Sequence, residues 1–348
     1  MKRITGLDLF RFIVAIGIMS YHYYFIGPLQ NFYSFNIFHP IAFFGEFGVD
    51  IFFIISGFVI LFSTTKVKEP LTFLKKRALR IYPAFIICSL FTLICGFIMP
   101  GVSKIDLLFR WINSLTFYED LWNVSPLSAI YWTLMIEIKF YILVAIILKL
   151  KLWDKHKYKI LLAWLVLSFL NIYIFKNNYI DILFLTKYSG HFIFGIILYL
   201  IYKDKKELKN IKLIGLSLLS LFLIYKNMIS YTTWIRGIYK GYVPSNLIIF
   251  IYMIVIIGIM YYIINYYKDI LPQKFVSTLG GMSFIIYLIH ADFGFFLKTQ
   301  YFIRLSNYIQ ISEPIIMIFS MIISITLSYI ILQLVNIITK YIKLKYKL

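Results

Sequence analysis

Residues 7–26 read LDLFRFIVAIGIMSYHYYFI, a run dominated by apolar side chains. A helix of about 20 such residues is long enough to cross the hydrocarbon core of a bilayer. Three ionisable side chains interrupt the run: Asp8, Arg11 and His22. Insertion of an Arg or Asp near the middle of a membrane helix costs about 2.5–3.5 kcal/mol, and less near its ends. The stretch therefore predicts a membrane-spanning helix that carries costly polar groups.

Arg11 and His22 are separated in a way that places both on one side of this helix. Eleven residues at about 100° each return to within roughly 20° of the starting direction, and the rise is about 16 Å. One interpretation is that Arg11 extends to a lipid headgroup and His22 lies at the opposite interface. The other is that both serve a function, as ionisable groups inside a membrane usually do.

The composition extends this prediction to the whole chain. Its 348 residues are 61% hydrophobic and 14% charged, with a mean hydropathy of +0.84. Soluble domains are about 45–50% apolar and about 25% charged. The formal charge of +20 is spread over short segments between apolar runs, which is typical of a topology signal. We therefore predict a polytopic membrane protein with no nucleic-acid partner.

The apolar runs predict an all-α membrane protein, a bundle of about ten transmembrane helices. The longest stretch outside them, residues 100–127, is predicted to be non-helical and is too short for a soluble domain. The expected helices cover residues 7–26, 41–62, 81–99, 128–148, 160–175, 184–202, 211–228, 246–267, 275–296 and 312–338.

Lysine and arginine predict the orientation of these helices. If the N-terminus is inside, the inner segments hold 24 of these residues and the outer segments hold 9. Such an excess marks the cytoplasmic side, so we expect both termini to be cytoplasmic. Arg11 would then lie near the cytoplasmic face and His22 toward the outer face.

The second expected helix contains EFGVDIFFIISGFVI, residues 46–60. Glu46 and Asp50 lie near its outer end, and Ser56 and Gly57 lie deeper. Small residues in a membrane helix permit close contact with another helix or with a bound chain. Asp50 and Ser56 are therefore candidate substrate-binding residues, and plain helix packing remains the alternative for Ser56 and Gly57.

After this helix, the sequence KKRALRIYP covers residues 75–83 and is predicted to be a cytoplasmic loop that Pro83 interrupts. Arg77 and Arg80 would share a face if the stretch were helical. Two arginines beside two lysines suit phosphate groups. A basic patch that binds anionic lipid is the alternative.

Two later helices also carry polar groups. YWTLMIEIKFYIL, residues 131–143, places Glu137 inside the fourth helix, where a buried carboxylate needs a partner. His22 or an arginine is the expected partner, and a purely structural ion pair is the alternative. LGGMSFIIYLIHADF, residues 279–293, places His290 toward the outer end of the ninth helix, as an interfacial or a functional residue.

The remaining residues suggest no other chemistry. No role is assigned to three further histidines, His39, His156 and His191. No cluster of cysteine and histidine has the spacing of a metal site, so no metal is expected. The sequence contains neither a Walker loop nor a G-x-S-x-G motif.

Five elements in order resemble the acyltransferase-3 family of membrane O-acyltransferases: Arg11 with His22, FFIISGF, RALRIYP, WTLMIE and MSFIIYLIH. The resemblance covers essentially the whole chain and departs from the family at LDLFR, where an Asp-Gly-Leu-Arg run is usual. It implies a single integral-membrane acyltransferase domain over residues 1–348, without a fused soluble domain. It also implies a location in a bacterial inner membrane.

By position in these motifs, His22 resembles the essential histidine of the family and Arg11 its partner. Arg77 and Arg80 resemble the arginines that follow the second helix, and Glu137 resembles the acidic residue of the fourth. The resemblance implies an acyl-CoA donor, most often acetyl-CoA, taken from the cytoplasm. The implied acceptor is a glycan or lipid-linked glycan outside, such as O-antigen, capsule or exopolysaccharide.

Together these features predict one mechanism. Arg77, Arg80 and nearby lysines hold the CoA phosphates, the pantetheine arm passes Arg11, and His22 acts as a general base on a sugar hydroxyl. Glu137 orients the imidazole. A covalent acyl-histidine route stays open. The competing functions are a glycan flippase or exporter that uses the same buried charges, and a glycan polymerase.

Overall fold

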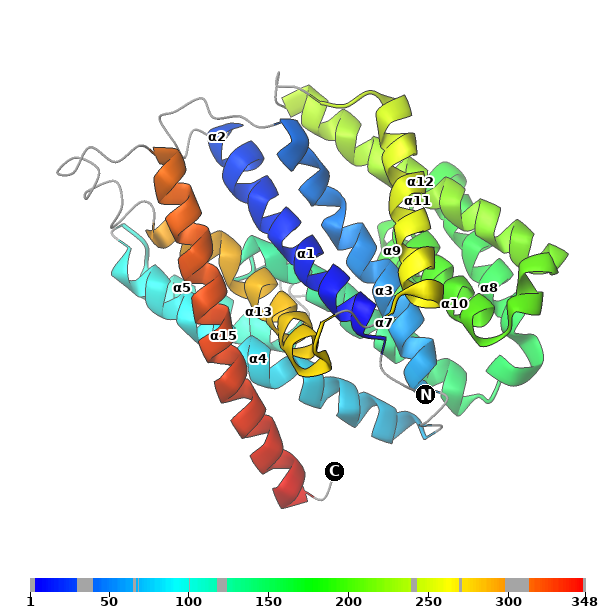
Figure 1. Cartoon of the computed structure of the whole chain (residues 1–348), viewed down its shortest axis with the longest axis horizontal. Coiled ribbons are helices and arrows are strands. Elements are labelled where there is room, and N and C mark those ends of the chain that lie inside the picture. Colours follow the sequence, from blue (N-terminus) through cyan, green and yellow to red (C-terminus); the bar gives the residue numbers. More distant parts are fainter. Residues whose placement is uncertain are drawn as a thin grey trace. The chain divides into compact units, whose positions relative to one another are not determined.

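The computed structural model describes residues 4–29, 40–64, 67, 69–99, 101–117, 124–238, 243–268, 271–297 and 313–346 (Figure 1). His39 lies outside this part of the chain. The described residues form helices of the α, 3-10 and π types and contain no strand. The elements are α1 (Thr5–Tyr21), η1 (His22–Ile26), α2 (Gly27–Leu29), η2 (Pro40–Phe47), α3 (Gly48–Thr64), α4 (Pro70–Ile98), α5 (Lys104–Thr116), η3 (Ala129–Tyr131), α7 (Trp132–Lys149), α8 (Trp153–Leu170), η4 (Asn171–Phe175), α9 (Asn178–Phe184), α10 (Ser189–Lys203), η5 (Lys205–Lys209), α11 (Ile211–Ile238), α12 (Asn246–Tyr266), α13 (Gln273–Leu297) and α15 (Glu313–Tyr346).

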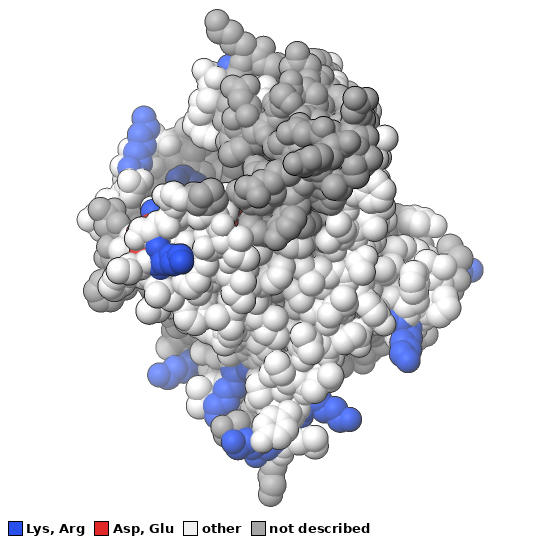
Figure 2. Space-filling model, turned by 90° about the vertical axis from the view of Figure 1, so that its left-hand side faces the viewer, with Lys and Arg blue, Asp and Glu red and all other residues white. Residues whose placement is uncertain are grey.

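Ten segments of the described chain are long and apolar enough to cross a membrane, which confirms the predicted all-α membrane fold. Figure 2 shows one face of the molecule, on which most lysine and arginine atoms lie toward the lower end and the left edge and leave a broad uncharged area. The spans are Thr5–Leu29, Pro40–Thr64, Pro70–Ile98, Ala129–Lys149, Trp153–Phe175, Asn178–Lys203, Ile211–Ile238, Asn246–Tyr266, Gln273–Gly294 and Ile315–Lys345.

The third span begins earlier than predicted, because the expected loop around residues 75–80 is part of α4. The carboxylate of Glu69 accepts hydrogen bonds from the backbone N–H groups of Leu71, at 3.0 Å, and of Thr72. Pro70 occupies the first helical position, where its missing N–H costs nothing. Pro83 stays inside the helix, which membrane helices tolerate where neighbouring groups satisfy the freed carbonyl. The prediction of a loop broken at Pro83 was therefore wrong.

The prediction that residues 100–127 are non-helical was also wrong in part, because α5 forms within this stretch. The hydroxyl of Ser103 caps this helix by accepting from the N–H of Asp106 at 3.3 Å, and Phe117 ends it in a left-handed conformation. The indole N–H of Trp111 donates to the Ser89 hydroxyl of α4 at 3.1 Å. Polar residues recur every three to four positions in this short amphipathic helix, so the prediction from long apolar runs did not recognise it as a helix.

The described residues divide into two compact units that each combine three parts of the sequence. One unit takes the described residues of Met1–Leu7, Phe47–Lys76 and Ile136–Asp269, and the other takes those of Asp8–Glu46, Arg77–Met135 and Ile270–Leu348. The predicted single domain over residues 1–348 stays a prediction.

In the first unit, glycines bring α3 and α10 into backbone contact. A Cβ atom on Gly57 would lie 2.1 Å from the carbonyl oxygen of Phe192, and one on Gly195 would lie 1.9 Å from that of Ile54. Only glycine fits at either position without a shift of one helix. This contact confirms the helix-packing interpretation for Gly57.

In the second unit, α13 packs against α15 and against the N-terminal helix. A Cβ atom on Gly280 would lie 2.5 Å from the Cβ of Asp8, and one on Gly294 would lie 1.6 Å from the hydroxyl of Tyr23. These two glycines set the close approach of α13 to both ends of the first span.

Candidate active site

The first span changes its helical type at His22. It is α-helical from Thr5 to Tyr21, so Arg11 and His22 keep the predicted separation of about 16 Å on one side. His22 then begins a π-helical turn, η1, that ends at Ile26. Such turns are rare and occur often at functional sites. No feature of the sequence indicated this turn.

The ring of His290 on α13 lies close to that of His22. The two imidazole centroids lie 4.9 Å apart and their planes are tilted by 50°. His290 is fully buried, whereas His22 is half-buried. His290 is therefore enclosed by protein, and His22 is the more accessible of the two.

Backbone carbonyls fix the chemical state of His290. Its Nδ1 atom lies 3.1 Å from the carbonyl oxygen of Ile286 and 2.8 Å from that of Tyr287. Because carbonyl oxygens only accept, Nδ1 carries the proton and Nε2 keeps its lone pair. Nε2 has no hydrogen-bond partner among the described residues. The structure therefore places a buried acceptor atom in the side chain next to His22.

Hydroxyl groups fasten the backbone around this histidine pair. The Tyr23 hydroxyl donates to the carbonyl oxygen of His290 at 2.8 Å. Tyr287 donates its hydroxyl hydrogen to the Ile130 carbonyl at 3.0 Å and accepts from the Thr133 hydroxyl at 2.9 Å. These bonds tie η1, α13 and the start of the fourth span to one another.

Glu137 finds hydroxyl partners instead of a cation. Its Oε1 atom accepts a hydrogen bond from Ser56 of α3 at 3.0 Å and another from Tyr141, one turn further along α7. The half-buried carboxylate is thereby solvated by the protein, as buried carboxylates require. Glu137 and His22 belong to different units, so their expected pairing stays a prediction.

Asp50 has a partner that the sequence analysis missed. Its Oδ1 atom lies 3.0 Å from Nε2 of His191 on α10, and the side chain of His191 is fully buried. His191 was placed at a helix end and given no role. The small residues before it, Ser189 and Gly190, were a signal that this end of the span is packed.

The two arginines of α4 differ in exposure. Arg77 is 9% exposed and follows Phe73 by one turn on the buried side of the helix, whereas Arg80 is exposed. Lys75 and Lys76 are exposed beside them. The helical register that would bring Arg77 and Arg80 together is present, but only Arg80 is open to a large anionic ligand.

Within the described residues, no three His, Cys, Asp or Glu side chains gather closely enough to hold an ion.

Comparison with known proteins identifies the family of this chain. The sequence model of the acyltransferase-3 family, described as an acyltransferase domain, matches residues 4–333. The chain is 26% identical over 176 residues to "Nodulation protein 10" of Rhizobium leguminosarum bv. viciae, a match that covers 44% of this chain and 46% of that relative. The chain thus matches less than half the length of that relative, and no solved structure matches it. Because the family match covers nearly the whole chain and includes both histidines, the chain belongs to the acyltransferase-3 family of membrane acyltransferases.

Proposed function

We propose that this protein transfers an acetyl group from acetyl-CoA, bound at the cytoplasmic side, to a hydroxyl group of a glycan outside the inner membrane of a bacterium. The observation that carries the proposal is the pair of His22 and His290, 4.9 Å apart, in a chain of an acyltransferase family. The predicted orientation, from 24 inner against 9 outer cations, places this pair toward the outer face.

His22 acts as the base in this mechanism. One of its ring nitrogens takes the proton of the sugar hydroxyl while the oxygen attacks the thioester carbonyl carbon. The carbon–sulfur bond then breaks, the ester stays on the sugar, and the proton on His22 passes to the departing CoA thiolate. A histidine at the start of a π-helical turn suits this role, because such turns occur often at functional sites.

His290 acts as a positioning residue for His22. Its Nδ1 hydrogen is held by backbone carbonyls, so its Nε2 lone pair can accept a hydrogen bond from the N–H of His22. That bond would fix the tautomer of His22 and direct its other nitrogen, the basic one, toward the substrate. A histidine thus supports the first imidazole in the way that a carboxylate does in a catalytic triad. Glu137 remains a second candidate for this task.

On the cytoplasmic side, Arg80 and the exposed lysines of α4 contact the CoA phosphates in this proposal. A guanidinium binds a phosphate through two parallel hydrogen bonds, and each such charge-assisted contact contributes about 1.5–3 kcal/mol. Arg77 is buried beside them and shapes the helix surface on which the phosphates lie. Arg11, about 16 Å from His22, lines the path of the pantetheine arm.

One experiment distinguishes His290 from Glu137 as the positioning residue. It compares the acetyl-CoA affinity, the turnover and the pH profile of turnover in His290→Gln and Glu137→Gln. Purified variants receive radiolabelled acetyl-CoA and surface glycan from a strain in which the gene is deleted. If His290 fixes the tautomer, His290→Gln keeps acetyl-CoA affinity, lowers turnover at least tenfold and changes the pH profile of turnover. An unchanged pH profile with normal turnover would remove His290 from the mechanism. Label that never reaches the glycan with wild-type protein would refute acetyl transfer and leave a transporter.

A further inference from the structure

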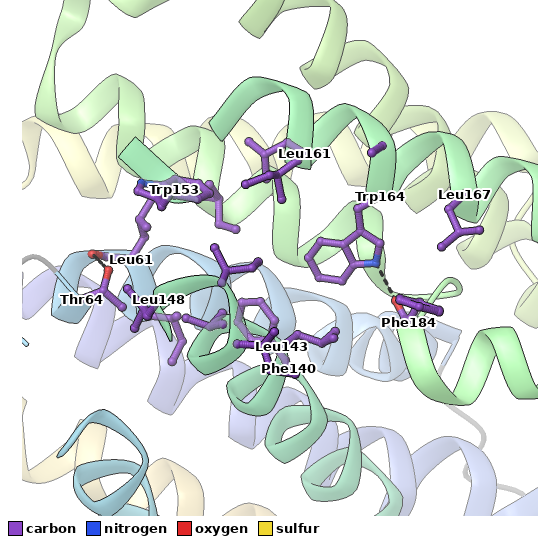
Figure 3. Close-up of a pocket in the computed structure, with 17 residues that line it drawn as sticks. Leu61, Thr64, Phe140, Leu143, Leu148, Trp153, Leu161, Trp164, Leu167 and Phe184 are labelled. Atoms are coloured by element: carbon purple, nitrogen blue, oxygen red, sulfur yellow. Dashed lines mark hydrogen bonds between the residues drawn. The ribbon is translucent and has the colours of Figure 1, made fainter. Parts of the chain in front are cut away.

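A cavity of about 300 Å³ lies within the first unit, between α3, α7, α8, α9 and α10 (Figure 3). We name it the α7–α8 cavity. Seventeen residues line it, and Figure 3 shows Trp153 and Thr64 at one end, Phe140 and Leu143 in the middle, and Phe184 near Trp164 toward the other end. None of the lining side chains is charged. The proposed mechanism makes no use of this cavity.

Three lining side chains carry a polar atom, Thr64, Trp153 and Trp164, and two of these already form hydrogen bonds. The Thr64 hydroxyl donates to the carbonyl oxygen of Leu61 at 2.9 Å, and the Trp164 indole N–H donates to that of Phe184 at 2.6 Å. A sugar or a nucleotide would lose its hydrogen bonds to water here and gain almost none in return. The lining therefore selects a hydrocarbon ligand.

The shape of the α7–α8 cavity suits a single chain. Along α8 the lining runs from Trp153 to Leu167, which at 1.5 Å per residue corresponds to about 21 Å. Half of a bilayer's hydrocarbon core measures about 15 Å. The lining is therefore long enough to hold one tail from one leaflet.

The Trp153 end of the cavity is basic. Lys149 ends α7, Lys151 lies between α7 and α8, and Lys155 lies in the first turn of α8. All three are exposed, and Asp154 is the carboxylate among them. Trp153 itself is a residue type that anchors at the membrane interface. A ligand whose chain fills the cavity and whose head lies at this end meets an excess of positive charge.

From this combination we infer that the α7–α8 cavity binds one acyl chain of an anionic phospholipid, with the lipid phosphate against Lys149 and Lys151. Basic groups beside apolar grooves between membrane helices recognise anionic lipids by the same physics. The charge distribution that predicts the orientation places this end on the cytoplasmic leaflet. The inference is independent of the acyl-transfer proposal.

The test uses the full chain purified in mild detergent and native mass spectrometry with two lipids of identical tails, a phosphatidylglycerol and a phosphatidylcholine. We expect the wild type to retain one phosphatidylglycerol and to bind it at least tenfold more tightly than phosphatidylcholine. Val144→Trp, which fills the cavity, should weaken binding at least tenfold. Val166→Trp makes the same change at an exposed site on α8 outside the lining, and it should bind normally.

Further variants distinguish recognition of the lipid acyl chain from recognition of the lipid headgroup. Lys149→Gln with Lys151→Gln should abolish the preference for phosphatidylglycerol while both lipids still bind. If Val144→Trp does not fold, phosphatidylglycerol with brominated tails gives the same information. It should quench tryptophan fluorescence in the wild type and much less in the double variant Trp153→Phe with Trp164→Phe, because both tryptophans line the cavity. Equal retention by Val144→Trp, equal quenching in the double tryptophan variant, or displacement of the lipid by equimolar long-chain acyl-CoA would overturn the inference.

Discussion

Gly294→Ala tests the packing that holds the two histidines together. A Cβ at this position would lie 1.6 Å from the Tyr23 hydroxyl, 2.3 Å from its Cζ and 2.7 Å from its Cε1. Non-bonded carbon atoms prefer about 3.5–4.0 Å, so the Tyr23 ring must move by more than 1 Å. Tyr23 is fully buried, which leaves the ring no open space to enter.

The cost follows from the contacts that this movement breaks. The hydrogen bond of 2.8 Å from Tyr23 to the His290 carbonyl would be lost, at about 0.5–1.5 kcal/mol. Overpacking adds about 1–3 kcal/mol. The higher helix propensity of alanine offsets about 0.5–1 kcal/mol of this destabilisation. The net destabilisation is therefore roughly 1–3 kcal/mol, and a misplacement of about 1 Å at His290 should lower turnover about 10–100-fold.

The assay measures thermal unfolding and acetyl transfer on the same purified preparation. Gly258→Ala is the matched control, because no heavy atom lies within 4 Å of the Cβ it would add. The control should keep normal turnover and be at least as stable as the wild type, because alanine has the higher helix propensity and its Cβ meets no clash. A Gly294→Ala variant with both wild-type stability and wild-type turnover would show that Tyr23 does not hold the histidine pair as described.

Three further predictions concern the fold and the donor side. Gly195→Ala should destabilise the protein by about 1–3 kcal/mol or prevent folding, because its Cβ would lie 1.9 Å from the Ile54 carbonyl oxygen. A melting temperature equal to that of the wild type would refute the contact between α3 and α10. Arg80→Ala should weaken acetyl-CoA binding about 10–100-fold and leave the melting temperature unchanged. Arg77→Ala should lower both the acetyl-CoA affinity and the melting temperature, because Arg77 is buried. If calorimetry gives the wild type and both variants the same CoA affinity, the phosphates bind elsewhere. Hydrogen bonds from the first turn of α4 lower the pKa of the exposed Glu69, so its contribution to stability is present above its unfolded pKa and is lost as the pH falls through the lowered value. The hydrogen-exchange protection factors at the start of α4, which correct for the intrinsic exchange rate at each pH, should therefore fall in acid in the wild type but not in Glu69→Gln.

The sequence predicted the spans well because apolar length is a local property. It failed where short-range polar chemistry decides the boundary. The Glu69 carboxylate and Pro70 begin α4 eleven residues before the expected start, although acidic caps and proline at a first turn are recognisable signals. The turn at Leu185, with φ of 53°, divides the sixth span into α9 and α10 without a glycine to mark it.

Individual site residues could be predicted from the sequence, but the contacts between them could not. His22, His290 and Glu137 were recognisable because ionisable groups are rare inside membranes. Their partners were not, since His290 lies 268 positions after His22 and Ser56 lies 81 positions before Glu137. The π-helical turn that begins at His22 depends on packing and left no local pattern.

The central claim is that His22 removes the proton of the acceptor hydroxyl. The most direct measurement is single-turnover acetyl transfer by purified His22→Gln, with acetyl-CoA affinity measured separately by calorimetry. Glutamine keeps a hydrogen bond but cannot take the proton at neutral pH, so the rate should fall by roughly 10²–10⁴ while the affinity stays within twofold of wild type. A folded His22→Gln that transfers acetyl groups at the wild-type rate would contradict the claim.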